Sequence, residues 1–428
     1  MFIIDKALEE RRRGGNPILV GLVGAGFMGR GIALQIFTSF PGIHLVAIAN
    51  RTISEAERVF RVASGRTPVR VGNISELESS IRTGNYAITD DPTLLCQAKG
   101  IDAVIEATGE VEFGAQVALE AIRAGKHIIL NNAELDATIG PILKVYADRN
   151  EVIISGIDGD EPGVAVNLIR HVKAIGFTPV LAGNLKGFYD PYRTPETQEE
   201  FAIQHGQNPA KVTSFVDGTK LSMESAVLAN ATGFRVWRRG MFGPRCSHVK
   251  EALTVFPLGK FLNGGVVDFI IGGEPGNGVF VVAHNENPIN REYLKYFKMG
   301  DGPFYLFYSP FHLPSFDLPL TVARSVLFRD ATVSPLGGPK CEVIAFAKKE
   351  LLAGEVLDGI GGFTCYGLIE NYEVCRKDEL LPIGLSGGCK MKRRVPADTP
   401  IQLADVDTPQ GRLCDRLWSE QNAKFHHK

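Results

Sequence analysis

The stretch ILVGLVGAGFMG (residues 18–29) decides the fold of this chain. ILVGLV (18–23) is a continuous apolar run, as expected for a strand that is buried on both faces of a sheet. A GxGxxG loop follows it and opens GAGFMGRGIALQIF (24–37), whose apolar residues recur at helical spacing. A strand, a glycine loop and a helix in this order predict a dinucleotide-binding turn.

Each glycine of the loop has a physical role in such a turn. Gly24 permits the tight turn, Gly26 lets the backbone approach a pyrophosphate, and Gly29 lets the helix pack closely on the strand. The helix N-terminus adds N–H donors and a partial positive charge, so Phe27 and Met28 belong to the predicted site. The alternative is a packing turn without a ligand, but the flanking strand and helix favour cofactor binding.

Strands and helices alternate through the first third of the chain. Further apolar strands are expected at LVAIA (45–49), IDAVIEAT (101–108), KHIIL (126–130) and EVIIS (151–155). Helices are expected at ISEAERVFRVAS (53–64) and FGAQVALEAIRAG (113–125). This alternation predicts an α/β fold with a Rossmann-type, doubly wound parallel sheet over residues 1–155.

The second strand ends in VAIANRT (46–52), where many dinucleotide-binding folds carry an acid about 20 residues beyond the glycine loop. Here Asn50, Arg51 and Thr52 occupy the place. A carboxylate would repel a 2′-phosphate, whereas Arg51 can pair with one and its two neighbours can donate hydrogen bonds to it. The residues therefore favour NADP(H), with NAD(H) as the alternative if Arg51 is only a solvated loop residue.

Composition limits the function classes. The chain has 428 residues, a formal net charge of −2 and 44% hydrophobic residues, which suits a globular protein of two or three domains. Near-neutral charge gives no case for nucleic acid or membrane partners, and no apolar run reaches the about 18 residues of a spanning helix. The first residues, MFIIDKALEERRRGG, do not resemble a secretory signal, so a cytoplasmic protein is expected. Seven scattered cysteines without a CxxC pair favour reduced thiols.

From about residue 156 the alternation breaks down, which predicts a central α+β substrate domain over 156–335. Charged and amide side chains directly follow several apolar strands, and the ligand of an open α/β sheet sits beyond such strand ends. They are Asn131, Asn132 and Glu134 after KHIIL, Asp158, Asp160 and Glu161 after EVIIS, and Lys186 after PVLAGNL. This clustering favours a site, although a solvated loop is the alternative for each residue alone.

Residues 220–231 are expected to form a helix on which Lys220 and Glu224 lie one turn apart. The pair is either an exposed ion pair or a polar stripe facing a cavity, and Asn230 is either a cavity residue or a hydrogen-bonded core amide. His312 stands between Phe311 and Leu313, which favours a packing role. No HExxH, GxSxG or P-loop motif supports a metalloprotease, serine hydrolase or kinase.

A family resemblance rests on motifs along nearly the whole chain. GLVGAGFMG, IDAVIEATG and AGKHIILNNAE resemble the cofactor domain of homoserine dehydrogenases. The longer series through GDEPG, AGNLKG, VDGTKLSMESAVLANATG, GVVDFIIGG and FHLPSFDLPLTVA resembles homoserine-dehydrogenase-like type II 1-deoxy-D-xylulose 5-phosphate reductoisomerases. AKKELLAGEVL and RRVPADTPI resemble an SAF-type domain, a small β-rich module, over 336–428 together with the tail. Ala133 stands where homoserine dehydrogenases carry a lysine, which counts against that enzyme itself.

The resemblance implies an NADP(H)-dependent rearrangement and reduction of a keto-sugar phosphate, usually with a divalent cation such as Mg or Mn. It places Ala107, Thr108, Gly109, Asn131 and Asn132 in the cofactor site. Lys186 or Lys220 would polarise the developing alkoxide, and Glu224 would orient the lysine. Asp160 and Glu161, with Glu134, would hold the cation or transfer protons.

Three hypotheses follow for the function. The first is a reductoisomerase or related sugar-phosphate reductase, and the second a dehydrogenase of another hydroxy-acid, polyol or semialdehyde. The third is a nucleotide- or carbohydrate-binding protein without turnover, which the intact glycine loop and the charged strand ends make the weakest. A small-molecule substrate and a homo-oligomer are the expected partners.

Overall fold

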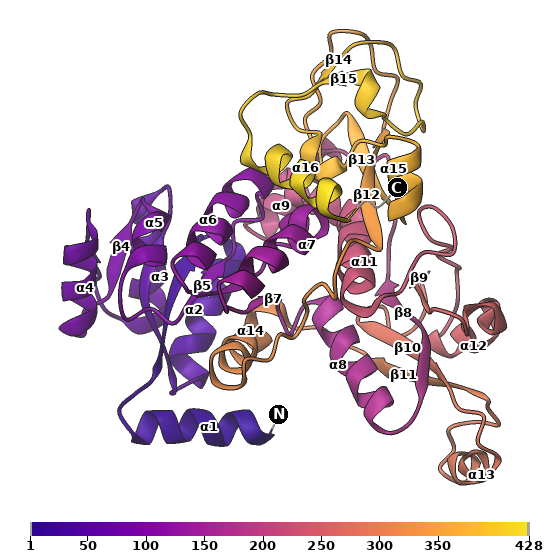
Figure 1. The fold of residues 1–428 in the computed structure, drawn as a ribbon, viewed down its shortest axis with the longest axis horizontal. Helices are drawn as coiled ribbons and strands as arrows, with labels where there is room; N and C mark the ends of the chain where they lie inside the picture. Colours follow the sequence, from indigo (N-terminus) through magenta and orange to yellow (C-terminus); the bar gives the residue numbers. More distant parts are fainter. Residues whose placement is uncertain (1, 426–428) are drawn as a thin grey trace. The chain divides into compact units, whose positions relative to one another are not determined.

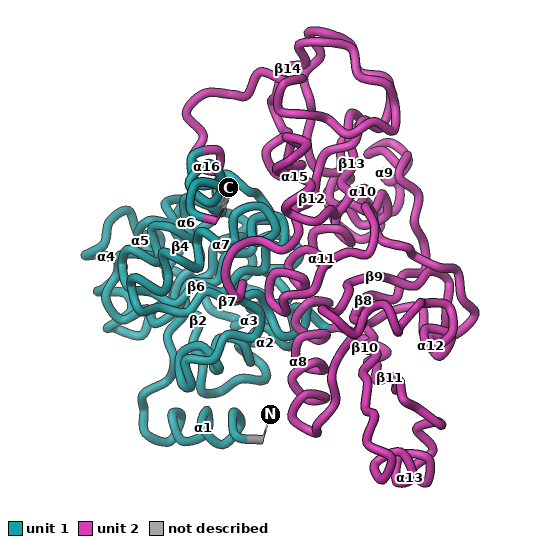
Figure 2. Tube along the Cα trace, turned by 45° about the vertical axis from the view of Figure 1, so that its right-hand side comes forward, with its two compact units in different colours: residues 1–160, 313–334, 416–424 teal, residues 161–312, 335–415, 425–428 magenta. Residues whose placement is uncertain are grey.

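The computed structural model describes residues 2–425, which form two compact units (Figure 2). Among the described residues, unit 1 comprises 2–160, 313–334 and 416–424. Unit 2 comprises 161–312, 335–415 and 425. Each unit is therefore assembled from segments that are distant in the sequence.

Unit 1 is built on a seven-stranded parallel sheet with the order β3-β4-β2-β1-β5-β6-β7. The strands are β1 (Ile18–Val23), β2 (Ile43–Ala49), β3 (Val69–Arg70), β4 (Ala87–Thr89), β5 (Ala103–Glu106), β6 (His127–Leu130) and β7 (Ile154–Gly156). β1 lies between β2 and β5, so the strand order reverses there, as in a doubly wound fold. The predicted Rossmann-type sheet is confirmed.

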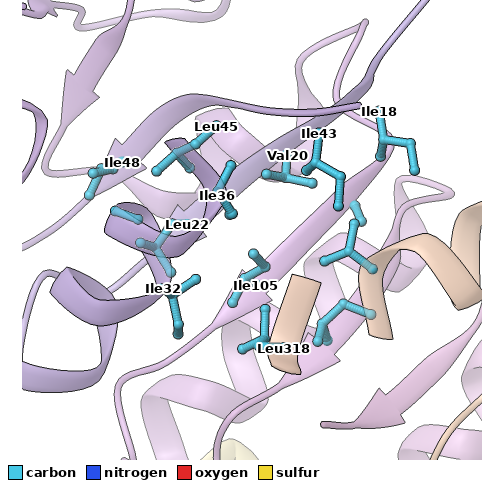
Figure 3. Close-up of a cluster of buried hydrophobic side chains, with 14 of the residues drawn as sticks. Ile18, Val20, Leu22, Ile32, Ile36, Ile43, Leu45, Ile48, Ile105 and Leu318 are labelled. Carbon is cyan, nitrogen blue, oxygen red and sulfur yellow. The ribbon is translucent and has the colours of Figure 1, made fainter. Parts of the chain in front are cut away.

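The helices of unit 1 cover this sheet or pack on the helices that cover it (Figure 1). They are α1 (Phe2–Arg13), α2 (Phe27–Ser39), α3 (Ile53–Ser64), α4 (Ile74–Arg82), α5 (Pro92–Gln97), α6 (Val111–Arg123), α7 (Ala133–Arg149), α14 (Pro314–Ala323), which continues as the π-helical turn η3 (Arg324–Phe328), and most of α16 (Leu413–Phe425). Figure 3 shows Leu22 of β1, Ile32 of α2 and Leu318 of α14 in one apolar cluster. Burying each such side chain stabilises the fold by about 1.5–3 kcal/mol.

The segment 313–334 was expected in the central domain, but it belongs to unit 1. The buried Asp158 carboxylate anchors it, accepting hydrogen bonds from Thr321 Oγ1 (2.9 Å) and Thr332 Oγ1 (2.7 Å). The Arg324 guanidinium pairs with the same carboxylate at 2.5 Å. Asp158 is thus a structural residue. Its contacts join residues far apart in the sequence, and the local sequence pattern does not reveal them.

The last helix, α16, also returns to unit 1 through most of its length. Gln421 Oε1 accepts a hydrogen bond from the Ile142 backbone N–H at 3.1 Å, and Tyr146 Oη donates to Glu420 at 2.8 Å. The tail therefore packs with the first segment instead of with the small C-terminal segment in which the sequence placed it.

Unit 2 contains a four-stranded mixed sheet with the order β11-β10-β8-β9. The strands are β8 (Thr178–Lys186), β9 (Val266–Ile271), β10 (Val279–His284) and β11 (Phe304–Ser309). The α-helices are α8 (Glu161–Ala174), α9 (Pro195–Gln204), α10 (Pro209–Val216), α11 (Thr219–Thr232), α12 (Ala252–Val255), α13 (Pro288–Tyr296) and α15 (Tyr372–Lys377). Short 3₁₀ turns are η1 (Val249–Glu251), η2 (Leu258–Phe261), η4 (Ile383–Leu385) and η5 (Leu403–Asp405). α8 and α11 pack against the sheet.

The C-terminal segment of unit 2 forms two small antiparallel sheets, β12 (Cys341–Ala347) with β13 (Cys365–Asn371) and β14 (Lys390–Met391) with β15 (Val406–Asp407). This segment is β-rich, as expected, while its SAF-type identity stays a prediction. Ser222 of α11 donates a hydrogen bond to the Gly367 carbonyl at 3.1 Å, so the segment packs directly on α11. Asn230 accepts from Lys340 N at 2.7 Å and from Cys341 N at 3.2 Å, which makes it a hydrogen-bonded core amide.

All seven cysteines lie in the described part of the chain, and all are buried and free of disulfides, as predicted. None of the helices within residues 2–425 combines the length and apolar content that a membrane crossing needs.

Candidate functional site

The glycine loop has the geometry that its sequence predicts. Gly24 has φ +109°, and a Cβ there would lie 2.9 Å from the Ala107 carbonyl oxygen. A Cβ on Gly29 would lie 2.2 Å from the Gly24 carbonyl oxygen, so both glycines are required by close backbone contacts. A Cβ on Gly26 would meet nothing within 4 Å, although Gly26 caps the N-terminus of α2. The protein itself does not require glycine there, which leaves the approach of a ligand as its physical reason.

Asn50 connects the end of β2 to this loop. Its Oδ1 accepts a hydrogen bond from the Ala25 N–H at 3.0 Å, and its Nδ2 donates to the Thr52 carbonyl at 2.8 Å. Only one of its two amide N–H donors is used by Thr52, so the donation from Asn50 to a 2′-phosphate stays a prediction. The Arg51 side chain is exposed at the same strand end.

A buried acid that the sequence analysis missed lies at the end of β5. Glu106 is fully buried and accepts hydrogen bonds from Asn132 Nδ2 (2.7 Å) and from the Thr108 N–H (2.8 Å). Burial raises the pKa of Glu106, and these hydrogen bonds oppose the rise. Asn132 also caps α7 by accepting from the Leu135 N–H at 3.0 Å. Glu106 therefore positions Thr108 and Asn132. The sequence feature that could have indicated this role is an acid inside the apolar run IDAVIEAT.

The other predicted cofactor residues lie at the same edge of the sheet. Ala107, Thr108 and Gly109 follow β5, and Asn131 follows β6, with its N–H donating to the Glu106 carbonyl at 2.8 Å. Phe27 and Met28 form the first turn of α2. All of these residues stand at the carboxyl ends of parallel strands beside the reversal at β1, where open α/β sheets bind ligands.

Of the predicted catalytic residues, unit 1 holds two. Glu134 lies in the first turn of α7 and raises the pKa of Glu106 by charge repulsion, while Asp160 closes the first segment of unit 1. Among residues 2–425, no group of three or more His, Cys, Asp or Glu side chains is arranged to hold a metal ion. The expected Mg or Mn site at Glu134, Asp160 and Glu161 is therefore not supported by the side-chain arrangement.

Unit 2 brings together Glu161, Asn184, Lys186 and Glu224, which we call the acid–lysine cluster. Glu161 is the first residue of α8, Asn184 and Lys186 lie two residues apart near the end of β8, and Glu224 lies on α11. Residues two apart in a strand share a face, so both β8 side chains point the same way. A carboxylate at the start of a helix is stabilised by the helix dipole.

The distances make Glu161 the centre of this cluster. Lys186 Nζ lies 2.8 Å and 2.7 Å from the two Glu161 carboxylate oxygens, and Asn184 Nδ2 donates to Oε2 at 2.5 Å. Glu224 Oε2 lies 3.7 Å from Lys186 Nζ and 3.5 Å from Asn184 Nδ2. Glu161 and Glu224 are 1% and 5% exposed, whereas the Lys186 side chain retains 21%. The two acids are sealed in the protein, and the lysine reaches its surface.

The two carboxyl groups are joined by a hydrogen bond, which requires that one of them carries a proton. Burial raises the pKa of Glu224 to about 8, the charge of Glu161 adds to the rise, and Lys186 opposes it. At neutral pH the cluster therefore contains a protonated Glu224 beside an ion pair of Glu161 and Lys186. An acid with a pKa near the working pH is suited to proton transfer.

Lys220 and His312 border the acid–lysine cluster. Lys220 lies one turn before Glu224 on α11, and its charge lowers the pKa of that acid. His312 Nδ1 lies 3.8 Å from Glu161 Oε1, so its interpretation as a packing residue missed this contact. The sequence held no signal for it, because the apolar neighbours of His312 say nothing about α8.

Two oxidoreductase models match the chain. The model described as an oxidoreductase family, NAD-binding Rossmann fold, matches residues 18–132, which include the glycine loop and the ends of β2, β5 and β6. The model described as oxidoreductase DRL, catalytic domain, matches residues 159–318, which include the whole acid–lysine cluster. The chain therefore carries two domains that match NAD-binding and catalytic domains of oxidoreductases.

A homoserine dehydrogenase of Neisseria gonorrhoeae (strain ATCC 700825 / FA 1090) is 25% identical over 170 residues. The match covers 37% of this chain and 36% of that protein, so it spans about a third of the curated relative.

Similar solved structures include a probable dehydrogenase from Thermotoga maritima, with 14% identity and a TM-score of 0.38 over 63% of this chain and 73% of that one. Scyllo-inositol dehydrogenase from Lactobacillus casei with bound NAD(H) and scyllo-inositol has 16% identity and a TM-score of 0.36. The match covers 62% of this chain and 73% of that one.

Proposed function

We propose that this chain catalyses NADP(H)-dependent hydride transfer to or from the carbonyl carbon of a small polyhydroxylated substrate. The observation that carries the proposal is Lys186, an accessible ammonium group held by two buried carboxyl groups inside the segment that matches an oxidoreductase catalytic domain. The reaction would be reduction or reductive rearrangement of a keto-sugar phosphate such as 1-deoxy-D-xylulose 5-phosphate.

The residues of unit 1 fit a dinucleotide. The open space at Gly26 and the N-terminal N–H groups of α2 suit a pyrophosphate. Asn50 fixes the loop against the end of β2, and the exposed Arg51 beside it suits a 2′-phosphate. These features support NADP(H) over NAD(H), because no acid stands at the strand end to favour an unmodified ribose.

The bound cofactor supplies the hydride, and the acid–lysine cluster handles the proton. In the reducing direction Lys186 Nζ donates a proton to the substrate oxygen as negative charge develops there. Glu161 then takes the proton of Glu224, with which it shares a hydrogen bond, and passes a proton to the neutral lysine amine. Solvent returns a proton to Glu224 after product release, so the cycle balances.

The first experiment is an NADPH oxidation assay with 1-deoxy-D-xylulose 5-phosphate, with and without a magnesium or manganese salt. Oxidation that gives a rearranged product supports a reductoisomerase. Oxidation only with other hydroxy-acid, polyol or semialdehyde compounds supports the dehydrogenase alternative. Tight NADPH binding without oxidation across the whole panel would overturn the catalytic proposal in favour of a binding protein.

A further inference from the structure

In the reducing direction of the proposed reaction, the acid–lysine cluster gives up one proton in every cycle. The reduced substrate would cover Lys186 Nζ until its release, at the time when Glu161 and Glu224 have both lost their protons. These two acids are 1% and 5% exposed, so they are sealed from water on their own. Neighbouring carboxylates that are both ionised repel one another, so the cluster needs a route by which a proton returns.

The contacts of Glu161 show where such a route can begin. Among the described residues, four side chains contact its carboxylate through hydrogen bonds or ion pairs, namely those of Asn184, Lys186, Glu224 and His312. Asn184 and Glu224 are buried, whereas the side chains of Lys186 and His312 are 21% and 24% exposed. With Lys186 covered by the substrate oxygen, His312 is the member of this set that still reaches solvent.

The imidazole of His312 has the chemistry for this step. Its Nδ1 lies 3.8 Å from Glu161 Oε1. A histidine can bind a proton at one ring nitrogen and release one from the other, which no other neutral side chain does near neutral pH. The gap is about 1 Å longer than a hydrogen bond, so a small rotation of the ring closes it, as is common for catalytic groups before the substrate binds.

Backbone contacts hold the chain before His312 close to the end of β8. The Gly278 carbonyl accepts a hydrogen bond from the Leu185 N–H at 2.9 Å. Gly278 has φ +99°, and a Cβ there would lie 2.1 Å from the Ser309 carbonyl oxygen, so glycine is required for this close approach. Ser309 Oγ donates to the Phe311 carbonyl at 2.8 Å. The place of His312 beside the cluster is thus built into the sheet.

We propose that His312, on the basis of the proposed function, is a relay residue that conducts the returning proton from solvent to Glu161 and on to Glu224. A buffer acid or hydronium ion protonates one nitrogen of the neutral ring, and the imidazolium releases its other proton to the Glu161 carboxylate. Glu161 passes a proton to Glu224 through their shared hydrogen bond. Exchange with water returns the ring to its starting tautomer, so one proton enters the cluster for each one that leaves.

A relay and a packing role for His312 predict different kinetics. The cluster begins with one stored proton on Glu224, so the first hydride transfer does not need His312. Loss of the relay should slow only the later cycles, in which the stored proton must be replaced. Loss of packing would instead disturb Glu161 and Lys186 and slow the first cycle as well.

Stopped-flow oxidation of NADPH by 1-deoxy-D-xylulose 5-phosphate, or by the best carbonyl compound of the panel, separates the two roles. His312→Phe keeps an aromatic ring but cannot carry a proton. With enzyme in excess, its single-turnover rate constant should stay within about twofold of wild type, whereas kcat with substrate in excess should fall by about 10- to 100-fold. Circular dichroism and NADPH binding verify that the variant is folded.

Chemical rescue gives a second measurement. Imidazole added to His312→Ala should raise kcat at least about fivefold, because the free base can carry the proton in place of the side chain. His284→Ala is the matched control. His284 also faces an acid, with Nε2 3.4 Å from Glu286 Oε1, and its side chain is 12% exposed. Because His284 does not contact Glu161, this variant should keep the wild-type kcat and not respond to imidazole.

Two results would overturn the relay while leaving the proposed function intact. One is a wild-type kcat in His312→Phe. The other is an equal loss in the single-turnover rate constant and kcat, without a response of His312→Ala to imidazole, which would return His312 to a packing role. A wild-type protein that transfers no hydride to any compound of the panel would overturn the proposed function and the relay together.

Discussion

Unit 2 contains two lysines that are held by buried carboxyl groups, and their surroundings differ. Lys348 Nζ contacts Asp217 Oδ2 at 3.0 Å and the carbonyl oxygens of Arg193 and Gly362 at 2.7 Å and 2.8 Å. These three acceptors match the three N–H donors of an ammonium group, and the side chain is only 3% exposed. Lys348 is therefore closed to any ligand and serves the fold.

Lys186 is contacted by two carboxyl groups. Its side chain is 21% exposed, and Nζ lies 2.7 Å from Glu161 Oε2 and 3.7 Å from Oε2 of the protonated Glu224. Burial of an ion pair alone therefore does not identify a site. A site is indicated when the ammonium group is accessible and a second acid beside it holds a proton.

The largest expected effect is that of Lys186→Met on turnover. Loss of the proton donor should reduce kcat by about 10²–10⁴-fold, while NADPH binding stays near wild type. Lys186→Arg retains the charge but cannot release a proton, so it should remain slow. An arginine variant with near-wild-type kcat would show that only the charge matters.

Lys348→Met should have the opposite result. It leaves Asp217 and two carbonyl groups buried without their cation, so the free energy of unfolding should fall by about 3–5 kcal/mol. Turnover per folded molecule should change little. Denaturant unfolding and kcat on the same preparation measure both quantities, and a stable but inactive variant would erase the distinction between the two lysines.

Unit 1 contains a buried acid, Asp136, whose effect on stability should depend on pH. Asp136 on α7 is 4% exposed, and burial raises its pKa to about 7. The neutral form is favoured in the folded state, so stability is highest below the unfolded pKa near 4 and falls as pH rises toward 7. The free energy of unfolding should fall by at most roughly 4 kcal/mol over this range, because each pKa unit corresponds to about 1.4 kcal/mol.

Asp136→Asn should therefore stabilise the protein at pH 8 and have little effect at pH 4. Thermal unfolding at both pH values measures the difference. Asp148→Asn on the same helix is the control. Because Asp148 is exposed, this variant should shift Tm by nearly the same amount at both pH values. A shift for Asp136→Asn that does not depend on pH would refute the buried-acid assignment.

The pH profile tests the proton on Glu224. Turnover in the reducing direction should fall above about pH 8 as Glu224 loses its proton, by tenfold per pH unit at the limit. Glu224→Gln should remove this alkaline limb and be slower at pH 7. An unchanged limb in the variant would exclude Glu224 as its origin.

The smallest expected effect is that of Arg51, an exposed cation, on cofactor preference. Arg51→Ala should raise KM for NADP(H) by about tenfold, which is about 1.4 kcal/mol, and leave KM for NAD(H) nearly unchanged. A wild-type preference for NAD(H), retained in Arg51→Ala, would reverse the cofactor assignment.

The sequence predicted unit 1 well because its signals are local. The run ILVGLV is β1 to the residue, and ISEAERVFRVAS is α3 to the residue. The segment 313–334 was misplaced because the buried pair of Asp158 and Arg324 joins residues that are far apart in the chain.

The acid–lysine cluster was only partly visible. Glu161, Lys186 and Glu224 were picked out from their places after strands and on a helix, and the fold brings them together. The contacts of Asn184 and His312 with Glu161 were missed, because each depends on how α8, β8 and the chain before α14 pack. Glu134 and Asp160 shared the same local signal but lie in unit 1.

The most direct test of the proposed chemistry follows deuterium from 4-deuterated NADPH into product, with 1-deoxy-D-xylulose 5-phosphate and a panel of related carbonyl compounds. We expect a labelled product from the wild-type protein and from folded Lys348→Met, and almost none from Lys186→Met that still binds NADPH. Equal labelling by Lys186→Met would contradict it, as would the absence of label from every compound with the wild-type protein.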